Sequence, residues 1–176
     1  GGPHATLFPK QMLKHFDCVV KGEGEQVITS IVRNRTKGIV EGIRTEALDT
    51  LPYPARYKLP MLLYPTKNEF LKKDRVFSIN TSRGCPYGCT FCSVKTIWGR
   101  TYRAFSPIYV AVEIHSLIET YHANGVYFRE DNFTYDRNRV MGICDLIKQW
   151  DLEWVCESRV EHLDEYLVKV MADAGC

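Results

Sequence analysis

The alternation of apolar and polar positions divides the chain into two regions of helices and strands. In the N-terminal region the pattern predicts a helix over 9–15, a strand over 17–21, a helix over 25–35 and a strand over 39–44. In the C-terminal region it predicts strands over 75–81, 126–129 and 154–157, each followed by a helix. A strand-helix unit that occurs three times predicts a parallel sheet with its helices on the outside.

The predicted helices carry start, stop and face signals. The first C-terminal helix begins at Ser106-Pro107, an N-cap followed by proline, and Gly125 is expected to end it. The next two are predicted over 137–150 and 164–174. The apolar face of the first comprises Val110 or Ala111, Ile114, Leu117, Ile118 and Tyr121, and that of the N-terminal helix comprises Val27, Ile28, Ile31 and Val32.

The segment between the two regions is rich in proline. Pro52, Pro54, Pro60 and Pro65 restrict the backbone and remove hydrogen-bond donors, which predicts a semi-rigid linker on the surface. We therefore predict three parts: 1–45, a linker over 46–74, and 75–176. Gly1-Gly2-Pro3-His4 is expected to form a loop after a strand, and Gly175-Cys176 follows a helix directly. Because the chain begins at Gly1 and not at methionine, we expect a piece of a longer protein.

Composition narrows the classes of protein. The 176 residues are 45% hydrophobic, 25% charged and 12% aromatic, which excludes disorder. The formal charge of +2 is spread without long blocks, so we expect neither a nucleic-acid partner nor a polybasic membrane anchor. The apolar runs are too short for a membrane span. The seven cysteines are an odd number, with three of them in eight positions, which favours reduced thiols in the cytoplasm and a metal site over a disulfide framework.

Cys85, Cys89 and Cys92 are spaced C-x3-C-x2-C in one loop, where glycines and a proline permit tight folding. Three thiolates can hold an iron-sulfur cube and leave one iron without a protein ligand, open to a substrate or cofactor. The alternative is a zinc site, with Cys144, Cys156 or His115 as the fourth ligand. The remaining cysteines, Cys18, Cys144, Cys156 and Cys176, are interpreted as small buried hydrophobes.

The cysteine motif and several other segments resemble one family. They are Ile79–Cys89, Gly99–Arg103, Ser106-Pro107, Phe128–Thr134, Ser158–Val160 and Met171–Cys176, together with Gly1–Thr6 and Lys21–Glu25. These segments resemble the radical S-adenosylmethionine (SAM) superfamily, in the branch with a cobalamin-binding domain. The resemblance implies an α/β fold: the C-terminal half of a Rossmann-like cobalamin-binding domain, then the first three βα units of a partial (βα)6 TIM-like radical SAM barrel.

The resemblance also implies roles for individual residues. Cys85, Cys89 and Cys92 would hold a 4Fe-4S cluster whose open iron chelates SAM, and Phe91 would lie near adenine unless it is a core aromatic. Glu130, Asp131 and Asn132 would bind the SAM amino group, although they depart from the usual Gly-Gly-Glu pattern and could instead cap the next helix. After the third strand, Glu157, Ser158 and Arg159 are likewise expected to bind the cofactor. Ser158 would bond to the ribose, and Arg159 would pair with the methionyl carboxylate unless it forms a surface ion pair. Gly1 and Gly2 would approach cobalamin, whose site is incomplete in this chain.

The implied function is reductive cleavage of SAM to a 5'-deoxyadenosyl radical, with methyl transfer to carbon, cyclisation or rearrangement of an unknown small molecule. A flavodoxin or ferredoxin would supply the electron. Two alternatives stay open. The chain could be a non-catalytic iron-sulfur electron-transfer module, which requires a fourth ligand such as Cys144 or Cys156, or an inactive fragment of such an enzyme.

Overall fold

The computed structural model describes residues 1–64 and 66–176, so the linker prediction at Pro65 lies outside the described residues. Two compact units are present. The first unit comprises Gly1–Leu51 and Gly84–Arg103, and the second comprises Pro52–Arg83 and Ala104–Cys176. The cysteine loop thus clusters with the N-terminal segment of the chain. The domain limits at 45 and 74 remain predictions from the sequence.

The first unit is built on a parallel pair of strands, β1 (Cys18–Lys21) and β2 (Gly38–Glu41), joined by helix α3 (Ile28–Asn34). Val19 lies opposite Ile39 in the pair. The remaining elements are short: α1 (Pro3–Leu7), α2 (Pro9–Met12), the 3-10 turn Leu48–Thr50 and α4 (Val94–Ile97). The strand-helix-strand order confirms the α/β pattern predicted for this region.

Two expectations for the first unit were wrong. Pro3 begins α1 where a loop was expected, because proline at the first helical position already has a helical φ. The predicted apolar face of α3 is not buried throughout. Val27 is buried, whereas Ile28 and Val32 are 49% and 69% exposed. The latter two are four residues apart and share a side of the helix that this unit leaves uncovered.

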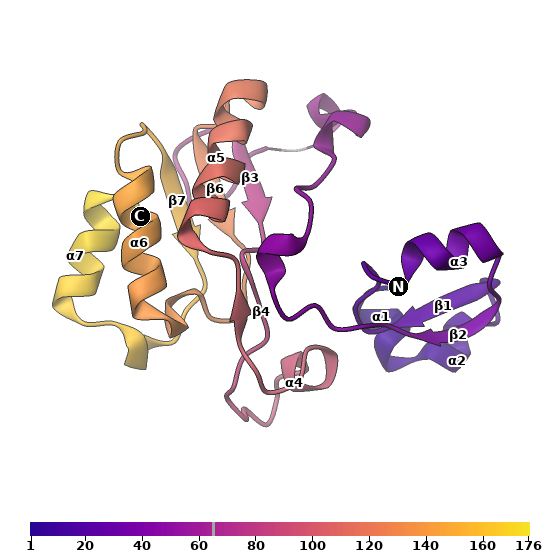
Figure 1. Ribbon diagram of the computed structural model, residues 1–176. Helices are drawn as coiled ribbons and strands as arrows, with labels where there is room; N and C mark the ends of the chain where they lie inside the picture. Colours follow the sequence, from indigo (N-terminus) through magenta and orange to yellow (C-terminus); the bar gives the residue numbers. More distant parts are fainter. Residues whose placement is uncertain (65) are drawn as a thin grey trace. The chain divides into compact units, whose positions relative to one another are not determined.

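The second unit contains a three-stranded parallel sheet in the order β3 (Val76–Ile79), β6 (Gly125–Phe128), β7 (Glu153–Cys156). Helices α5 (Pro107–Tyr121), α6 (Arg137–Ile147) and α7 (Glu165–Asp173) lie together on one face of this sheet (Figure 1). This arrangement confirms the three predicted strand-helix units. The shorter elements are the strands β4 (Ser82–Arg83) and β5 (Arg103–Ala104) and the 3-10 turns Arg56–Lys58, Met61–Leu63, Phe133–Tyr135 and Val160–His162.

The N-cap of α5 is confirmed, but its predicted stop was wrong. The Ser106 hydroxyl accepts a hydrogen bond from the Tyr109 amide at 3.2 Å. The helix ends at His122, which takes a left-handed conformation with φ 54°. Gly125 instead begins β6, where a Cβ atom would lie 2.8 Å from the Val76 side chain. The glycine is therefore required by strand packing and not by the helix end.

The core of the second unit is an aromatic cluster on its sheet. Phe128 contacts Phe133 at 4.5 Å between ring centroids and meets Trp154 edge-on at 5.3 Å. Trp154 is 1% exposed, and its indole nitrogen donates to the Ala174 carbonyl at 2.8 Å. This bond satisfies the one polar atom of a fully buried ring and joins the end of α7 to β7.

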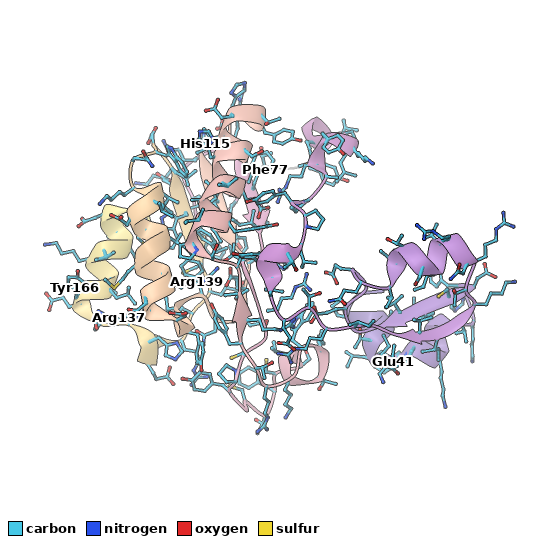
Figure 2. All side chains as sticks on the ribbon, in the orientation of Figure 1. Glu41, Phe77, His115, Arg137, Arg139 and Tyr166 are labelled. Carbon is cyan, nitrogen blue, oxygen red and sulfur yellow. The ribbon has the colours of Figure 1, made fainter. Side chains whose placement is uncertain are left out.

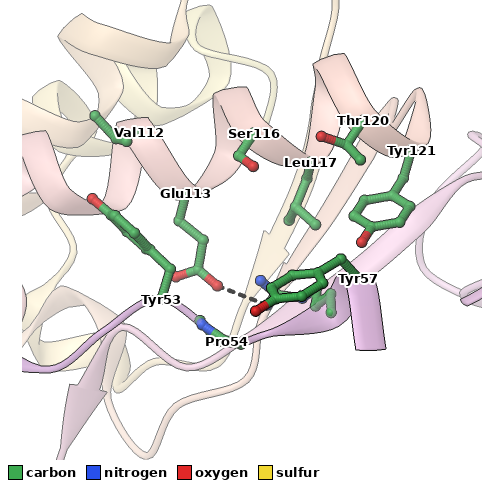
Figure 3. Close-up of a pocket in the computed structure, with 10 residues that line it drawn as sticks. Tyr53, Pro54, Tyr57, Val112, Glu113, Ser116, Leu117, Thr120 and Tyr121 are labelled. Atoms are coloured by element: carbon green, nitrogen blue, oxygen red, sulfur yellow. Dashed lines mark hydrogen bonds and ion pairs between the residues drawn. The ribbon is translucent and has the colours of Figure 1, made fainter. Parts of the chain in front are cut away.

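The proline-rich segment packs along α5. The rings of Tyr53 and Tyr109 stack at 4.2 Å, and Arg56 forms a largely buried ion pair of 2.6 Å with Glu113. Between the segment and the helix lies a cavity of about 260 Å³, which Tyr57 helps to line (Figure 3). No helix among the described residues combines the length and the hydropathy needed to cross a bilayer.

Candidate functional site

The cysteine loop runs from the end of β4 to the start of β5 and contains α4. Gly84, directly before the first cysteine, has φ 83°, and a Cβ atom there would lie 2.2 Å from the carbonyl oxygen of Thr101. Only glycine fits this position, on both grounds. A turn follows, in which the Cys92 amide donates to the Cys89 carbonyl at 3.2 Å. The loop is thus closed at its base, where its two ends meet.

Cys85, Cys89 and Cys92 are half-buried, and none of them is in a disulfide. Over residues 1–64 and 66–176, no three His, Cys, Asp or Glu side chains are grouped closely enough to hold a metal ion. The donor set fits an iron-sulfur cluster chemically, since three thiols extend from one irregular loop. The thiols still have to converge, so cluster binding is expected to be coupled to a rearrangement of this loop.

Phe91 lies between the second and third cysteines of the motif. Its side chain is 92% exposed, so the alternative interpretation as a core aromatic was wrong. An exposed ring next to metal-ligating residues offers a face for stacking against a planar group. Its predicted place near adenine stays a prediction.

Glu130 lies two residues beyond β6 and is 5% exposed. One carboxylate oxygen accepts from the Thr81 amide at 2.8 Å and from the Thr81 hydroxyl, and the other accepts from the Ser82 hydroxyl. Asp136, and not Glu130, caps α6. Because both oxygens are already engaged within the chain, this geometry favours a role in holding the segment before the cysteines.

Arg139 reaches the same segment from α6 and is buried (Figure 2). Its guanidinium donates to the carbonyls of Thr81 and Phe105, each at 2.8 Å, and to the Thr81 hydroxyl. Thr81 is therefore held from two sides, by a carboxylate and by a guanidinium. Nothing in the local sequence around Glu130 or Arg139 signals this, because the partners are roughly fifty residues apart in the chain.

Asn132 is the most enclosed of the predicted cofactor-binding residues, whereas its neighbour Asp131 is exposed. The Asn132 side chain has no exposed surface, and its amide nitrogen has no hydrogen-bond partner. Its carbonyl oxygen lies 3.2 Å from the Nδ1 atom of His162, a residue that the sequence did not single out. A buried amide NH2 group with no acceptor is costly, which fits a polar ligand group at this edge of the sheet.

Glu157, Ser158 and Arg159 follow β7, as predicted. Glu157 accepts from the Tyr127 hydroxyl and raises the pKa of that phenol. The Ser158 and Thr134 hydroxyls form a hydrogen bond, and Arg159 forms an ion pair with Glu161. The structure thus places these three residues at the same edge of the sheet as Asn132, the carboxyl ends of β6 and β7.

Gly1 and Gly2 precede α1. Gly2 has φ 94°, a conformation that favours glycine, and a Cβ atom there would meet nothing within 4 Å. The side of Gly2 that faces outward is open, so its backbone is accessible to a ligand. Their predicted contact with cobalamin stays a prediction.

The segment of the chain that contains these residues matches a known protein family. The sequence model of the Radical SAM superfamily matches residues 79–176, more than half of the chain. The chain belongs to the radical SAM superfamily. The matched segment contains the three cysteines, Glu130, Asn132 and the residues after β7.

Several curated relatives of this radical SAM chain match it from end to end. An uncharacterized methyltransferase of Pyrococcus horikoshii is 33% identical over 100% of this chain and 42% of its own length. The bacteriochlorophyllide d C-8(2)-methyltransferase of Chlorobaculum tepidum is 26% identical over 100% and 41%, and the anaerobic magnesium-protoporphyrin IX monomethyl ester cyclase of Rubrivivax gelatinosus is 30% identical over 99% and 36%. The chain therefore spans about two fifths of the length of these relatives.

A solved structure shares the fold of the radical SAM chain. The cobalamin-dependent S-adenosylmethionine radical enzyme OxsB, with aqua-cobalamin and S-adenosylmethionine bound, superposes with a TM-score of 0.70 at 14% identity. The match covers 100% of this chain and 29% of OxsB. At this identity the likeness shows the fold alone.

The four cysteines outside the motif differ in environment. Cys144 is 1% exposed, and burial raises the pKa of its thiol to about 12, as expected for a buried hydrophobe. The Cys156 thiol donates to Cys176, which raises the pKa of Cys156 and lowers that of Cys176. Cys176 is exposed and Cys18 is half-buried, so the interpretation as a buried hydrophobe was wrong for Cys176. The sequence could not show the hydrogen bond between Cys156 and Cys176, because the two cysteines lie on different elements.

These environments predict an order of alkylation among the three thiols of the second unit. With a pKa of about 12, the Cys144 thiol is ionised in only about one molecule in ten thousand at about pH 8. Cys176 is exposed and has a lowered pKa, so iodoacetamide should modify it first and Cys144 last. Peptide mass spectrometry over a time course measures the order in the native protein. Modification of Cys144 as fast as Cys176 would contradict the burial.

Proposed function

We propose that this chain is part of a radical SAM enzyme that binds a 4Fe-4S cluster through Cys85, Cys89 and Cys92. The bound cluster supplies an electron that cleaves SAM to methionine and a 5'-deoxyadenosyl radical. The single observation that carries the proposal is the C-x3-C-x2-C loop, with half-buried thiols, inside the segment that matches the family. Three thiolates leave one iron of the cluster open to SAM, which a closed four-cysteine site does not.

Other residues of the chain are proposed to bind and orient SAM. Asn132, with its unused buried amide donor, and Asp131 lie next to the end of β6, where the SAM amino acid moiety is expected. Ser158 is proposed on the ribose, Arg159 on the methionyl carboxylate and Phe91 on the adenine ring. The support for these roles is their shared location after strands of a parallel sheet, the face where barrel active sites form.

The whole protein is proposed to use cobalamin as well and to act on a small molecule, by methyl transfer to carbon, cyclisation or rearrangement. The printed names of the relatives, two methyltransferases and a cyclase, support this range of reactions. The bound cobalamin in OxsB and the open space beside the backbone of Gly2 support the second cofactor. A flavodoxin or ferredoxin is the proposed electron donor and the cytoplasm the proposed compartment, because an odd number of cysteines, three of them within eight positions, favours reduced thiols over a disulfide framework.

The test is anaerobic reconstitution of the chain with iron and sulfide. The reduced protein should give the electron paramagnetic resonance (EPR) spectrum of a 4Fe-4S cluster, and addition of SAM should change that spectrum because SAM binds the open iron. Formation of 5'-deoxyadenosine under reducing conditions would extend the result to turnover. A cluster spectrum that SAM leaves unchanged, at concentrations up to solubility, would refute the open iron.

A further inference from the structure

The cysteine loop ends at Arg103, whose side chain is one of the most deeply buried charges in the first unit. The guanidinium is 5% exposed and forms an ion pair with Glu23, whose side chain is 6% exposed. The ion pair is bidentate: Nη2 donates to one carboxylate oxygen of Glu23, and Nη1 donates to the other at 3.2 Å. Nη1 also donates to the Thr45 carbonyl, and the Thr45 amide donates back to Glu23 at 3.2 Å.

This contact joins residues that are far apart in the chain. Glu23 lies in the Lys21–Glu25 segment, which begins at the last residue of β1; it is eighty residues before Arg103 and outside the segment matched by the family. Removing either partner would leave a buried charge without compensation, which costs far more than an exposed pair. The planar guanidinium of arginine also fixes the orientation of the two hydrogen bonds to the carboxylate. Lysine at this position would keep the charge and lose this bidentate geometry.

The backbone around the pair is equally constrained. A Cβ atom at Gly42 would lie 2.1 Å from the Glu23 carbonyl oxygen, so the backbone directly after β2 passes against Glu23. At the other side, Gly84 packs on Thr101, two residues before Arg103. Fixing Arg103 therefore also fixes Gly84, the residue before the first cysteine. Helix α4, which follows the cysteines, lies against α1 of the same unit.

We propose that Glu23 is a positioning residue for the iron-sulfur loop. By holding Arg103, Glu23 fixes the end of the loop that contains Cys85, Cys89 and Cys92. The N-terminal segment thus helps to shape the cluster site. The inference rests on the proposed function, since it concerns the same cluster. It assigns to Lys21–Glu25 a role toward the cluster, beyond the likeness of this segment to a cobalamin-binding domain.

The test compares Glu23→Gln with Glu41→Gln in the reconstituted chain. Glu41 is a matched control, because it lies in the same unit but is 71% exposed and pairs with Lys21 at the surface (Figure 2). Three quantities are measured: the folded fraction by circular dichroism, iron per folded chain, and the EPR change on titration with SAM. We expect Glu23→Gln to lower iron per folded chain or to weaken the apparent affinity for SAM by about tenfold or more, and Glu41→Gln to match the unaltered chain.

A purely structural role for Glu23 would lower the folded fraction and leave the iron content and SAM response of the folded molecules unchanged, and that result would overturn the proposal. If Glu23→Gln does not fold, Arg103→Lys is measured in the same way, since it keeps the charge and removes the bidentate contact. Normal iron content and SAM response in Arg103→Lys would likewise overturn it. Failure of the unaltered chain to form a SAM-responsive cluster would refute the proposed function instead.

Discussion

Replacement of Cys85, Cys89 or Cys92 by serine is expected to abolish the iron-sulfur cluster, whereas Cys144→Ser and Cys156→Ser should leave it intact. The thiolate is the ligand, and a serine hydroxyl neither ionises near neutral pH nor offers a soft donor to iron. The three motif cysteines share one loop, so each missing thiol removes one of only three ligands. Cys144 is buried with a pKa of about 12, which makes it a poor candidate ligand.

The measurement is iron and acid-labile sulfide per chain after anaerobic reconstitution, together with the EPR spectrum of the reduced protein. Cys144→Ser is the matched control, since it changes the same atom at a site outside the loop. Loss of the cluster in Cys144→Ser or Cys156→Ser, with the protein still folded, would contradict the three-ligand assignment. That outcome would favour a closed four-ligand site and hence the electron-transfer or zinc alternative.

The second large effect is expected at Arg139, whose replacement by methionine should lower the free energy of unfolding by about 3 kcal/mol. Methionine has a similar length but cannot donate to the carbonyls of Thr81 and Phe105, so the buried Phe105 carbonyl loses this donor and the Thr81 carbonyl retains the Phe105 amide at 3.0 Å. Thr81 lies four residues before Cys85, so the same change should also reduce iron per folded chain. Equilibrium urea denaturation measures the first effect and reconstitution the second.

Arg137→Met is the matched control on the same helix. The Arg137 side chain is 40% exposed and forms an ion pair with Asp164 at the surface, and its guanidinium carbon lies 5.7 Å from the centroid of the Tyr166 ring (Figure 2). Loss of this exposed side chain should therefore change the unfolding free energy little. Equal effects of Arg137→Met and Arg139→Met would contradict the role assigned to the buried guanidinium. A stable Arg139→Met protein with normal cluster content would show that Glu130 alone holds the Thr81-Ser82 segment.

Local patterns accounted for much of what could be predicted. Three strands, their parallel order and the Ser106 cap follow from periodicity and from one side chain that bonds the adjacent backbone. Where local signals competed, the prediction failed: Gly125 resembled a helix stop, but His122 ended α5 and the glycine was needed against Val76. A stop signal in the sequence does not show which strand packs against the residue.

The sequence by itself determined the order of the main strands and helices and the three cysteines, because helix and strand periods and the C-x3-C-x2-C spacing are properties of neighbouring residues. Only the tertiary structure decided what the buried charges do. It engaged both oxygens of Glu130 with Thr81 and Ser82, and it paired Glu23 with Arg103. It also brought His162 beside Asn132. A buried charge or amide is satisfied by whichever group the fold brings within about 3 Å, and that choice depends on contacts distant in sequence.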